Sequence, residues 1–312
     1  MKNDVCVLVP TLNEAETIAD IVTKFLADGY QVLVIDGHST DDTRELAAGA
    51  GAEVITQTGK GKGQAIQQAF ATIESEYLVM IDGDGTYLPD EIDVVLAPVL
   101  SGEADHVIGN RFANFSQEAF TRLNLVGNKL LNKMFGIIYG GWLNDILSGY
   151  RAFNKKAYKG IELNKTGFEI ETEITVECVK KDLRIVEVPI TYLPRRKGAP
   201  TKLNPFKDGA RIGITICKLA KLYNPMFYFG VFGAIFMLFG VGIGIYVVNE
   251  WLYGITHVLL TILSTLVIII GIQLFIFGLI ANLIAALHRE TLREIRRKMR
   301  YIPEQEKIDQ MR

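Results

Sequence analysis

Short apolar runs alternate with longer helix-like stretches through the first two thirds of the chain. Short runs between turn residues are typical of buried strands, and the stretches that join them are typical of crossover helices. The expected strands cover residues 5–9, 32–35, 53–55, 77–81, 107–109 and 185–191. The expected helices run from the polar cap 11–14 to about Leu26, from the loop 36–41, over 62–73, and from Phe168. This pattern predicts an α/β fold with a doubly wound, mostly parallel sheet that binds ligands at the carboxyl ends of its strands.

Two long uncharged runs follow in the last third of the chain. Neither Met226–Asn249 nor Val258–Leu287 contains a charged residue. As a helix, each is long enough to cross a hydrocarbon core of about 30 Å, and the second, at about 45 Å, would tilt. We therefore expect two transmembrane helices, and the alternative is a buried helical hairpin of a soluble protein.

Basic stretches flank these two runs. Residues 205–222 predict a helix in the plane of the membrane interface, because its cations are spaced by four, seven and three and apolar residues lie on its other faces. The cations are Lys207, Arg211, Lys218 and Lys221. The tail 289–312 is also basic, and it fits anionic lipid as well as a solvated face or a subunit contact. The positive-inside rule places residues 1–204 and both termini in the cytosol, with the spans inside 223–288.

The overall charge of −2 conceals two oppositely charged parts. Residues 1–193 carry 17 Lys and Arg against 28 Asp and Glu, a net charge of −11, whereas residues 194–312 carry 16 against 7, a net charge of +9. The acidic body is a poor nucleic-acid binder, and the basic part suits an anionic membrane surface. Three widely spaced cysteines, and an N-terminal apolar run too short for a signal peptide, fit a reducing cytosol.

Candidate chemistry lies where the predicted strands end. Asp82 and Asp84, one glycine apart after a buried strand, can share a hard divalent cation with diphosphate oxygens, although an Asp-Gly turn is the alternative. The first loop, Pro10–Glu14, lacks Gly-x-Gly-x-x-Gly, which disfavours a nicotinamide-dependent dehydrogenase. We expect a different nucleotide ligand.

Cations form a second candidate set. Lys62 lies in a glycine-rich loop, 59–63, that resembles a phosphate cradle but is not a P-loop, and a flexible turn is the alternative. Further cations could bind one anionic substrate, although scattered arginines are usually surface residues. They are Arg111, Arg151, Arg195, Arg196 and Lys202. His38 is expected to be a loop residue that forms a hydrogen bond and not a metal ligand, because no other histidine has metal-ligand spacing with it.

A series of motifs across residues 4–204 resembles, in order and spacing, the polyprenyl-phosphate glycosyltransferases of glycosyltransferase family 2, typified by dolichyl-phosphate mannose and glucose synthases. The motifs are Val-Pro-Thr-Leu-Asn-Glu (9–14), Ile-Asp-Gly-His-Ser-Thr-Asp (35–41), Gly-Lys-Gly (61–63), Asp-Gly-Asp-Gly (82–85), Gly-Asn-Arg-Phe (109–112), Asp-Ile-Leu-Ser-Gly-Tyr-Arg (145–151) and Arg-Arg-Lys-Gly-Ala-Pro-Thr-Lys-Leu (195–203). The resemblance implies a GT-A fold, a nucleotide-sugar donor, Mg2+ or Mn2+, and dolichyl or polyprenyl phosphate as acceptor. It leaves open a homo-oligomer.

The resemblance also implies roles for single residues. Asp84 and Arg111 are the expected catalytic residues, and Asp84 is expected to bind the metal together with Asp82. The expected contacts of the nucleotide sugar are Pro10, Leu12, Glu14, Asp36, Lys62, Asp82 and Gly83. The expected contacts of the acceptor phosphate are Arg111, Ser148, Arg151, Arg195, Arg196 and Lys202.

Several positions depart from the mannose synthases. Asn144 replaces an arginine that precedes their equivalent of Asp145, which leaves Arg151 to take its role, and either Arg195 or Arg196 could be the matching arginine of the basic loop. The remaining departures are Leu12, Gly37 and Thr86, where many mannose synthases have Tyr, Asp and Gln. Together they favour a UDP-sugar, glucose or N-acetylglucosamine, over GDP-mannose.

The expected reaction is transfer of one hexose with inversion, for protein N-glycosylation or cell-surface glycan assembly. A lipid phosphate has a second pKa of about 6, so it is nucleophilic at neutral pH and needs no strong general base. Glu169, Glu171, Glu173 and Glu177 are therefore interpreted as the polar face and first turn of a helix. The rival functions are a processive polysaccharide synthase, disfavoured by the missing Gln-x-x-Arg-Trp motif, and a non-enzymatic membrane partner of a glycan-assembly complex.

Overall fold

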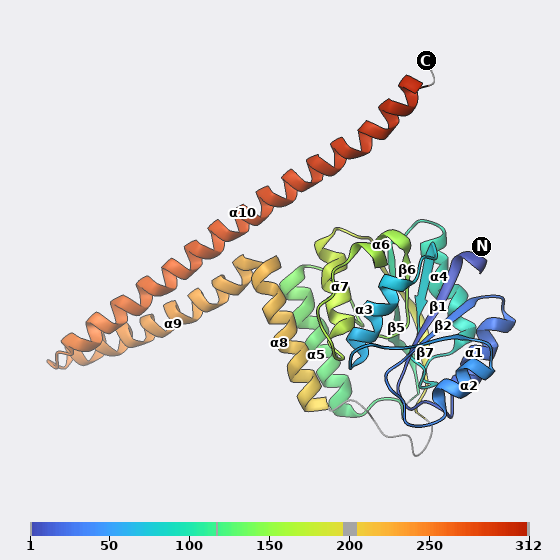
Figure 1. The fold of residues 1–312 in the computed structure, drawn as a ribbon. Helices are drawn as coiled ribbons and strands as arrows, with labels where there is room; N and C mark the ends of the chain where they lie inside the picture. Colours follow the sequence, from blue (N-terminus) through green and yellow to red (C-terminus); the bar gives the residue numbers. More distant parts are fainter. Residues whose placement is uncertain (1, 117, 196–204, 311–312) are drawn as a thin grey trace. The chain divides into compact units, whose positions relative to one another are not determined.

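The computed structural model describes residues 2–116, 118–195 and 205–310 (Figure 1). Within this part of the chain, contacts separate two compact units, Met1–Ile216 and Cys217–Arg312. The boundary falls inside one helix, α8 (Pro205–Tyr223). The first unit contains the sheet and every candidate site residue that the structure describes, and the second contains the two long apolar runs.

A seven-stranded sheet forms the first unit, in the order β3-β2-β1-β4-β6-β5-β7. Its strands are β1 (Val5–Thr11), β2 (Gln31–Asp36), β3 (Glu53–Thr56), β4 (Tyr77–Met80), β5 (His106–Phe115), β6 (Arg151–Asn154) and β7 (Ile185–Tyr192). The predicted α/β fold with a mostly parallel sheet is confirmed. Strand β6 was not predicted, and it lies antiparallel to both β4 and β5. It is only four residues long and begins with a buried arginine, so it lacks the apolar run that marks a strand in sequence.

Helices cover both faces of this sheet (Figure 1). They are α1 (Ile18–Ala27), α2 (Thr43–Gly49), α3 (Lys62–Thr72), α4 (Ile92–Leu100), α5 (Arg122–Tyr139), α6 (Lys155–Gly160) and α7 (Ile170–Lys180), with short 3-10 turns at Lys2–Asp4 and Pro89–Glu91. The helix expected directly after the 11–14 cap begins later, at Ile18. The reason is that Asn13 has a left-handed φ of 51° and its side chain accepts a hydrogen bond from the Thr40 amide, so these residues form a loop.

The core lies in two layers, one on each face of the sheet. Alternate residues of β1 point to opposite faces, so Val7 and Val9 join one cluster and Leu8 joins the other. Phe25 of α1 and Val95 of α4 complete the first cluster. Phe70 of α3 and Ile174 of α7 complete the second. Apolar burial on both faces therefore holds the strand ends, and the loops that follow them, at one edge.

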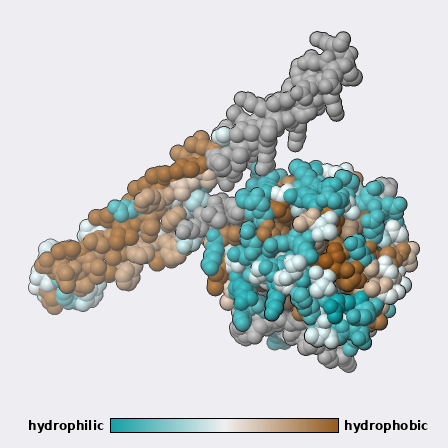
Figure 2. Space-filling view, in the orientation of Figure 1, coloured by the Kyte–Doolittle hydropathy of each residue, from teal (hydrophilic) through white to brown (hydrophobic). Residues whose placement is uncertain are grey.

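The second unit contains α9 (Pro225–Leu252) and α10 (Val258–Gln310). Among the described residues, Pro225–Leu252 and Val258–Leu287 are long and apolar enough to cross a membrane, and only 11% and 17% of an apolar 18-residue window in each are buried. The two runs Pro225–Leu252 and Val258–Leu287 are hydrophobic over most of the surface that Figure 2 shows. They approach closely at Gly233 and Gly271, where a side chain on Gly233 would collide with the Gly271 carbonyl. Two apolar helices that pack on each other and expose most of their surface are unlike the core hairpin of a soluble protein.

Candidate active site

The carboxyl ends of β1, β2 and β4 meet because these strands are parallel neighbours in the sheet. The loops after β1 and β2 are cross-linked, since the Asn13 amide donates to Ser39 Oγ and the Glu14 amide donates to Thr43 Oγ1, each at 2.8 Å. Asp36 is fully buried and accepts hydrogen bonds from the Ser39 amide and hydroxyl, at 2.9 and 2.5 Å. The predicted nucleotide-binding loops Pro10–Glu14 and 36–41 are therefore brought together as one rigid edge.

Gln57, directly after β3, lies at the same edge and was missed by the sequence analysis. Its backbone amide donates to the Asp36 carbonyl at 2.9 Å, and Gln57 is only 2% exposed. Within the described part of the chain, Gln57 Oε1 and Thr11 Oγ1 are buried without a hydrogen-bond partner. No sequence motif includes Gln57. Its position shortly after the predicted strand 53–55 was the one sign in the sequence that it could lie at this edge.

Lys62 joins two carboxylates at this edge. Its Nζ lies 2.6 Å from Asp82 Oδ1 and 2.5 Å from Glu171 Oε1. Burial opposes the charged form, but the two carboxylates outweigh it and raise the pKa of Lys62 above its ordinary value. Gly149 packs directly on the Asp82 carboxylate, where a Cβ would overlap it. Asp82 is thus held from two sides.

The four glutamates at the start of α7 are not a solvated polar face, which corrects the sequence interpretation. Glu169, Glu171, Glu173 and Glu177 are all at least nine-tenths buried. Glu173 accepts hydrogen bonds from the backbone amides of Asn164 and Lys165, and Glu177 pairs with Lys180. Burial raises the pKa of Glu173. The partners of Glu171 and Glu173, Lys62 and the loop 164–165, lie outside α7, so the helical pattern alone could not reveal them.

Asp84 is held by hydrogen bonds from Thr86 and by an ion pair with Arg195. Its Oδ1 accepts from the Thr86 amide at 3.1 Å and the Thr86 hydroxyl at 2.6 Å, and its Oδ2 lies 2.6 Å from Arg195 Nη2. Gly83 lies between the two aspartates, and its carbonyl accepts from the Thr17 hydroxyl at 2.5 Å. The turn brings Asp82 and Asp84 to the same edge, as the sequence predicted for a shared ligand.

The donor set fits a hard divalent cation. Asp82 and Asp84 supply carboxylate oxygens, each of which already faces a positive charge, from Lys62 and Arg195 respectively. No group of three or more His, Cys, Asp or Glu side chains able to hold a metal occurs among the residues that the structure describes. Two protein ligands leave room for diphosphate oxygens and water, which is the arrangement that Mg2+ accepts beside a nucleotide.

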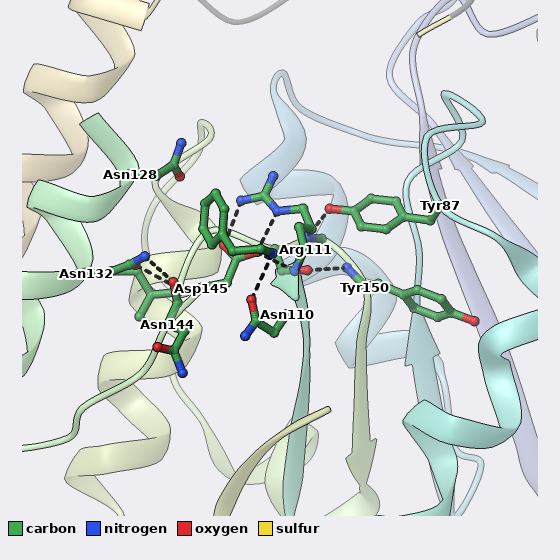
Figure 3. A network of polar contacts seen from close by, with 12 residues as sticks. Tyr87, Asn110, Arg111, Asn128, Asn132, Asn144, Asp145 and Tyr150 are labelled. Atoms are coloured by element: carbon green, nitrogen blue, oxygen red, sulfur yellow. Dashed lines mark hydrogen bonds and ion pairs between the residues drawn. The ribbon is translucent and has the colours of Figure 1, made fainter. Parts of the chain in front are cut away.

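Arg111, in the middle of β5, is fixed by a buried bidentate ion pair (Figure 3). Its Nε and Nη2 each lie 2.7 Å from the Asp145 carboxylate, and its backbone amide also donates to Asp145. The guanidinium lies 5.3 Å from the centre of the Tyr192 ring and 5.6 Å from that of Phe120. Burial opposes its charge, but Asp145 raises the pKa of Arg111 well above the ordinary value. Arg111 therefore presents a permanent, rigidly oriented cation.

Side chains from three elements clamp the backbone of the loop 144–149. Glu187 of β7 accepts from the amides of Asn144 and Asp145 at 2.8 Å, and Asn132 of α5 accepts from the Ile146 amide at 3.1 Å. The Tyr87 hydroxyl accepts from the Gly149 amide at 2.9 Å. Figure 3 shows Asn132 and Tyr87 on opposite sides of the Arg111–Asp145 pair. Since Gly149 also touches Asp82, this loop connects the acidic edge to Arg111.

Ser148 and Arg151 lie deeper than their predicted phosphate contacts require, since both are fully buried. Arg151 donates from Nε to the Ser148 carbonyl at 2.7 Å and from Nη2 to the Ile146 carbonyl at 2.6 Å. Its Nη1 donates to Thr175 Oγ1 at 2.9 Å and faces the His106 ring. The structure therefore places Arg151 underneath the loop, and we infer a positioning role for it in place of phosphate binding.

The remaining predicted cations divide between described and undescribed residues. Arg195 reaches Asp84, so this arginine meets the acidic edge. Arg196 and Lys202 lie outside the described residues. His38 Nε2 lies 3.0 Å from the Gly59 carbonyl, which confirms the expected hydrogen bond within the loops.

Comparison with known proteins adds the family context. Residues 6–161 match the family described as Glycosyl transferase family 2. Glycosyltransferase AglJ of Haloferax volcanii is 46% identical over 294 residues, which cover 93% of this chain and 97% of that protein. A Dolichyl-phosphate hexose transferase of the same organism is 32% identical over 221 residues, which cover 70% of this chain and 94% of that protein.

A solved structure shares the fold. Glucosyl-3-phosphoglycerate synthase from Mycobacterium tuberculosis, in complex with Mn2+, uridine diphosphate and glucosyl-3-phosphoglycerate, superposes with a TM-score of 0.57. The match covers 69% of this chain and 79% of that chain at 21% identity. At 21% identity, this similarity supports a shared fold and nothing more.

Proposed function

The chain belongs to glycosyl transferase family 2 and is a glycosyltransferase, and we propose that it transfers one hexose from a UDP-sugar to a dolichyl or polyprenyl phosphate at a membrane. The observation that carries this proposal is the 2.6 Å ion pair between Arg195 and Asp84. Arg195 begins the basic segment expected to hold the acceptor phosphate, and Asp84 belongs to the acidic loop expected to hold the donor. Their contact supports a donor and an acceptor that meet at one edge of the sheet.

On the donor side, Asp36 and the loop Pro10–Glu14 hold the nucleoside, while Asp82, Gly83 and Lys62 approach the diphosphate. A divalent cation, Mg2+ or Mn2+, held by Asp84 and Asp82 would neutralise the departing nucleoside diphosphate as a Lewis acid. The Thr86 hydroxyl donates to Asp84 Oδ1 and so fixes the orientation of this carboxylate. The departures at Leu12, Gly37 and Thr86 support UDP over GDP as the nucleotide.

On the acceptor side, the phosphate oxygen attacks without a general base, because a phosphate monoester is already largely ionised at neutral pH. Arg111, fixed by Asp145, and Arg195 orient this oxygen for in-line attack and inversion at the anomeric carbon. Within the described residues Arg111 Nη1 has no hydrogen-bond partner, so it is the donor that can face the phosphate. The dolichyl-phosphate relative supports this class of acceptor.

The membrane part of the proposal rests on α8, α9 and α10. The two apolar helices span the bilayer, α8 lies in the interface, and the basic flanks keep the catalytic unit and both termini in the cytosol. This placement lets a prenyl chain stay in lipid while its phosphate reaches the site. The two candidate spans among the described residues support single-sugar transfer over polysaccharide export. The product serves protein N-glycosylation or cell-surface glycan assembly.

The test is transfer of labelled sugar by the full chain in proteoliposomes that contain dolichyl phosphate. We expect product from UDP-glucose or UDP-N-acetylglucosamine, little from GDP-mannose, and loss of product on removal of divalent cations. Asp84→Asn should lower the rate by roughly 10²-fold or more, because it removes charge stabilisation at the leaving group. Asp90→Asn, at a carboxylate with a 71% exposed side chain, is the matched control and should keep the wild-type rate.

Two results would contradict the proposal. If no donor gave a lipid-linked sugar above the Asp84→Asn background, the acceptor assignment would fall. If Asp84→Asn transferred sugar at the wild-type rate, the metal assignment would fall while the family would stand.

A further inference from the structure

Lys62 is the first residue of α3, where the positive end of the helix dipole disfavours a cation. Two carboxylates compensate for this position, since Lys62 Nζ lies 2.6 Å from Asp82 Oδ1 and 2.5 Å from Glu171 Oε1. The side chains of Asp82, Lys62 and Glu171 are 24%, 15% and 5% exposed. Glu171 is therefore the closed end of this triad, and a ligand that approaches from solvent meets Asp82 and Lys62.

The glycines on either side of Lys62 allow a close fit to a distant loop. A Cβ on Gly61 would overlap the Thr166 carbonyl oxygen, and a Cβ on Gly63 would overlap the Lys165 carbonyl oxygen. The Gly63 amide also donates to the Thr166 carbonyl at 3.0 Å. Because this amide is used within the protein, the ammonium of Lys62 is the group here that is suited to bind an anion.

The loop that meets these glycines leads into α7 and is anchored to both helices. Glu173 of α7 accepts from the Lys165 backbone amide at 2.8 Å, and Gln67 of α3 donates to the Lys165 carbonyl at 2.7 Å. Glu171 lies in the first turn of α7, where the helix dipole favours a carboxylate. The position of Glu171 relative to Lys62 is therefore set by the packing of the two helix starts as well as by the ion pair.

The number of donors on the ammonium gives the two carboxylates a consequence for ligand binding. An ammonium carries three N–H donors. Within the described part of the chain, Asp82 and Glu171 take two of them. The two carboxylates also raise the pKa of Lys62, so the ammonium stays charged at neutral pH in spite of its burial. One donor of a permanently charged group is thus left for a ligand.

We propose that Glu171 is a positioning residue for the donor diphosphate, which holds the Lys62 ammonium so that its third N–H binds a diphosphate oxygen. The proposal rests on the proposed function only in that a uridine diphosphate binds at this edge. Glu171 itself does not touch the ligand, because it is the most buried member of the triad. Without the charge of Glu171, Lys62 would pair with Asp82 alone and would bind the diphosphate less well.

The test compares UDP with uridine, which lacks the diphosphate, on the full chain in detergent micelles with Mg2+. Calorimetry measures the affinity for UDP, and saturation-transfer NMR measures the affinity for uridine. The variant Glu171→Gln keeps the size of the side chain and removes its charge, and Lys62→Met removes the ammonium. Glu177→Gln is the matched control, because it removes another buried carboxylate from the same helix.

We expect Glu171→Gln to lower the affinity for UDP by roughly 10-fold or more, the effect of one hydrogen bond to a charged group, and to leave the affinity for uridine unchanged. Lys62→Met should show the same selective loss, because Glu171 acts through Lys62. Glu177→Gln should bind both ligands as wild type does.

Three results would overturn the positioning role of Glu171. Equal loss of UDP and uridine in Glu171→Gln would mean that Glu171 only maintains the fold. An unchanged or higher affinity for UDP would mean that its charge does not serve the diphosphate and at most repels it. An unchanged affinity for UDP in Lys62→Met would remove the group through which Glu171 acts. A wild-type chain that bound neither ligand would instead contradict the proposed UDP-sugar donor.

Discussion

At the scale of single residues, the site is built from charges that are neutralised before any ligand arrives. Lys62 is shared by Asp82 and Glu171, Arg111 is paired with Asp145, and Arg195 lies on Asp84. Buried charges of this kind require partners, because an isolated one would lose its hydration without compensation. The proposed diphosphate donor and phosphate acceptor would exchange partners within this network instead of meeting unpaired charges.

Arg151→Lys provides a test of the positioning role. Lysine keeps the charge but cannot reach the Ile146 and Ser148 carbonyls and Thr175 together. The loop 144–149 should therefore shift relative to Arg111. We expect kcat to fall by about 10-fold to 10²-fold, as for a small misplacement of an aligned group, with donor affinity unchanged. Steady-state kinetics with calorimetry of the UDP-sugar measures both. A higher acceptor KM at unchanged kcat would instead indicate direct phosphate contact.

Asp105 gives a pH-dependent stability prediction away from the site. Burial disfavours its charged form, but hydrogen bonds from Arg184 and Asn154 outweigh burial and lower the pKa of Asp105. A carboxyl with a lowered folded-state pKa stabilises the fold above the unfolded value of about 3.9, and that contribution is lost as the pH falls through the folded value. Thermal unfolding should show Asp105→Asn less stable than wild type at pH 7, with the gap narrowing on acidification. A gap that stayed constant with pH would contradict the linkage.

At the scale of elements, the loop 144–149 is the joint between the two halves of the site. It follows α5 and leads into β6, the strand that runs antiparallel to β4 and β5, and Gly149 packs on the Asp82 carboxylate. Glu187 of β7 and Asn132 of α5 hold it from the other side. A substitution at Gly149 should therefore reduce donor binding more than it reduces the stability of the fold.

Gly149→Ala tests this joint. The added Cβ would overlap the Asp82 carboxylate and push it away from Lys62, and overpacking of this kind costs roughly 1–3 kcal/mol, or about 10-fold to 10²-fold in donor affinity. Calorimetry of UDP-sugar binding measures the loss. Gly49→Ala, where nothing lies within 4 Å of the new Cβ, is the matched control and should bind as wild type does. Equal affinity in both variants would refute a role of the loop in placing Asp82.

At the scale of the whole molecule, the chain separates into two compact units that suit two solvents. The first carries the sheet and the described site residues, and the second carries the apolar helices. The opposite net charges of residues 1–193 and 194–312, −11 and +9, follow nearly the same division. Catalysis and membrane attachment are therefore expected to be separable by truncation.

Removal of residues 226–312 tests this separation. The truncated chain keeps every described residue of the donor edge, so its affinity for the UDP-sugar should stay near the full-length value. Use of long-chain dolichyl phosphate should fall much more than use of a short, water-soluble prenyl phosphate, because the acceptor is no longer collected at the membrane. Calorimetry and product chromatography measure the two effects. Equal loss of donor binding and of long-chain transfer would mean that the two apolar helices are needed only for folding.

The sequence by itself determined the α/β fold, most strands, the acidic loops at their ends and the two apolar helices. These features depend on periodicity and on short motifs, which report the local backbone and the side that is buried. Only the tertiary structure decided the antiparallel β6, the burial of Arg151, and the partnership of Lys62 with Glu171. Each of these depends on which distant segment packs against a residue, and an arginine at a surface and one beneath a loop look alike in sequence until long-range packing chooses between them.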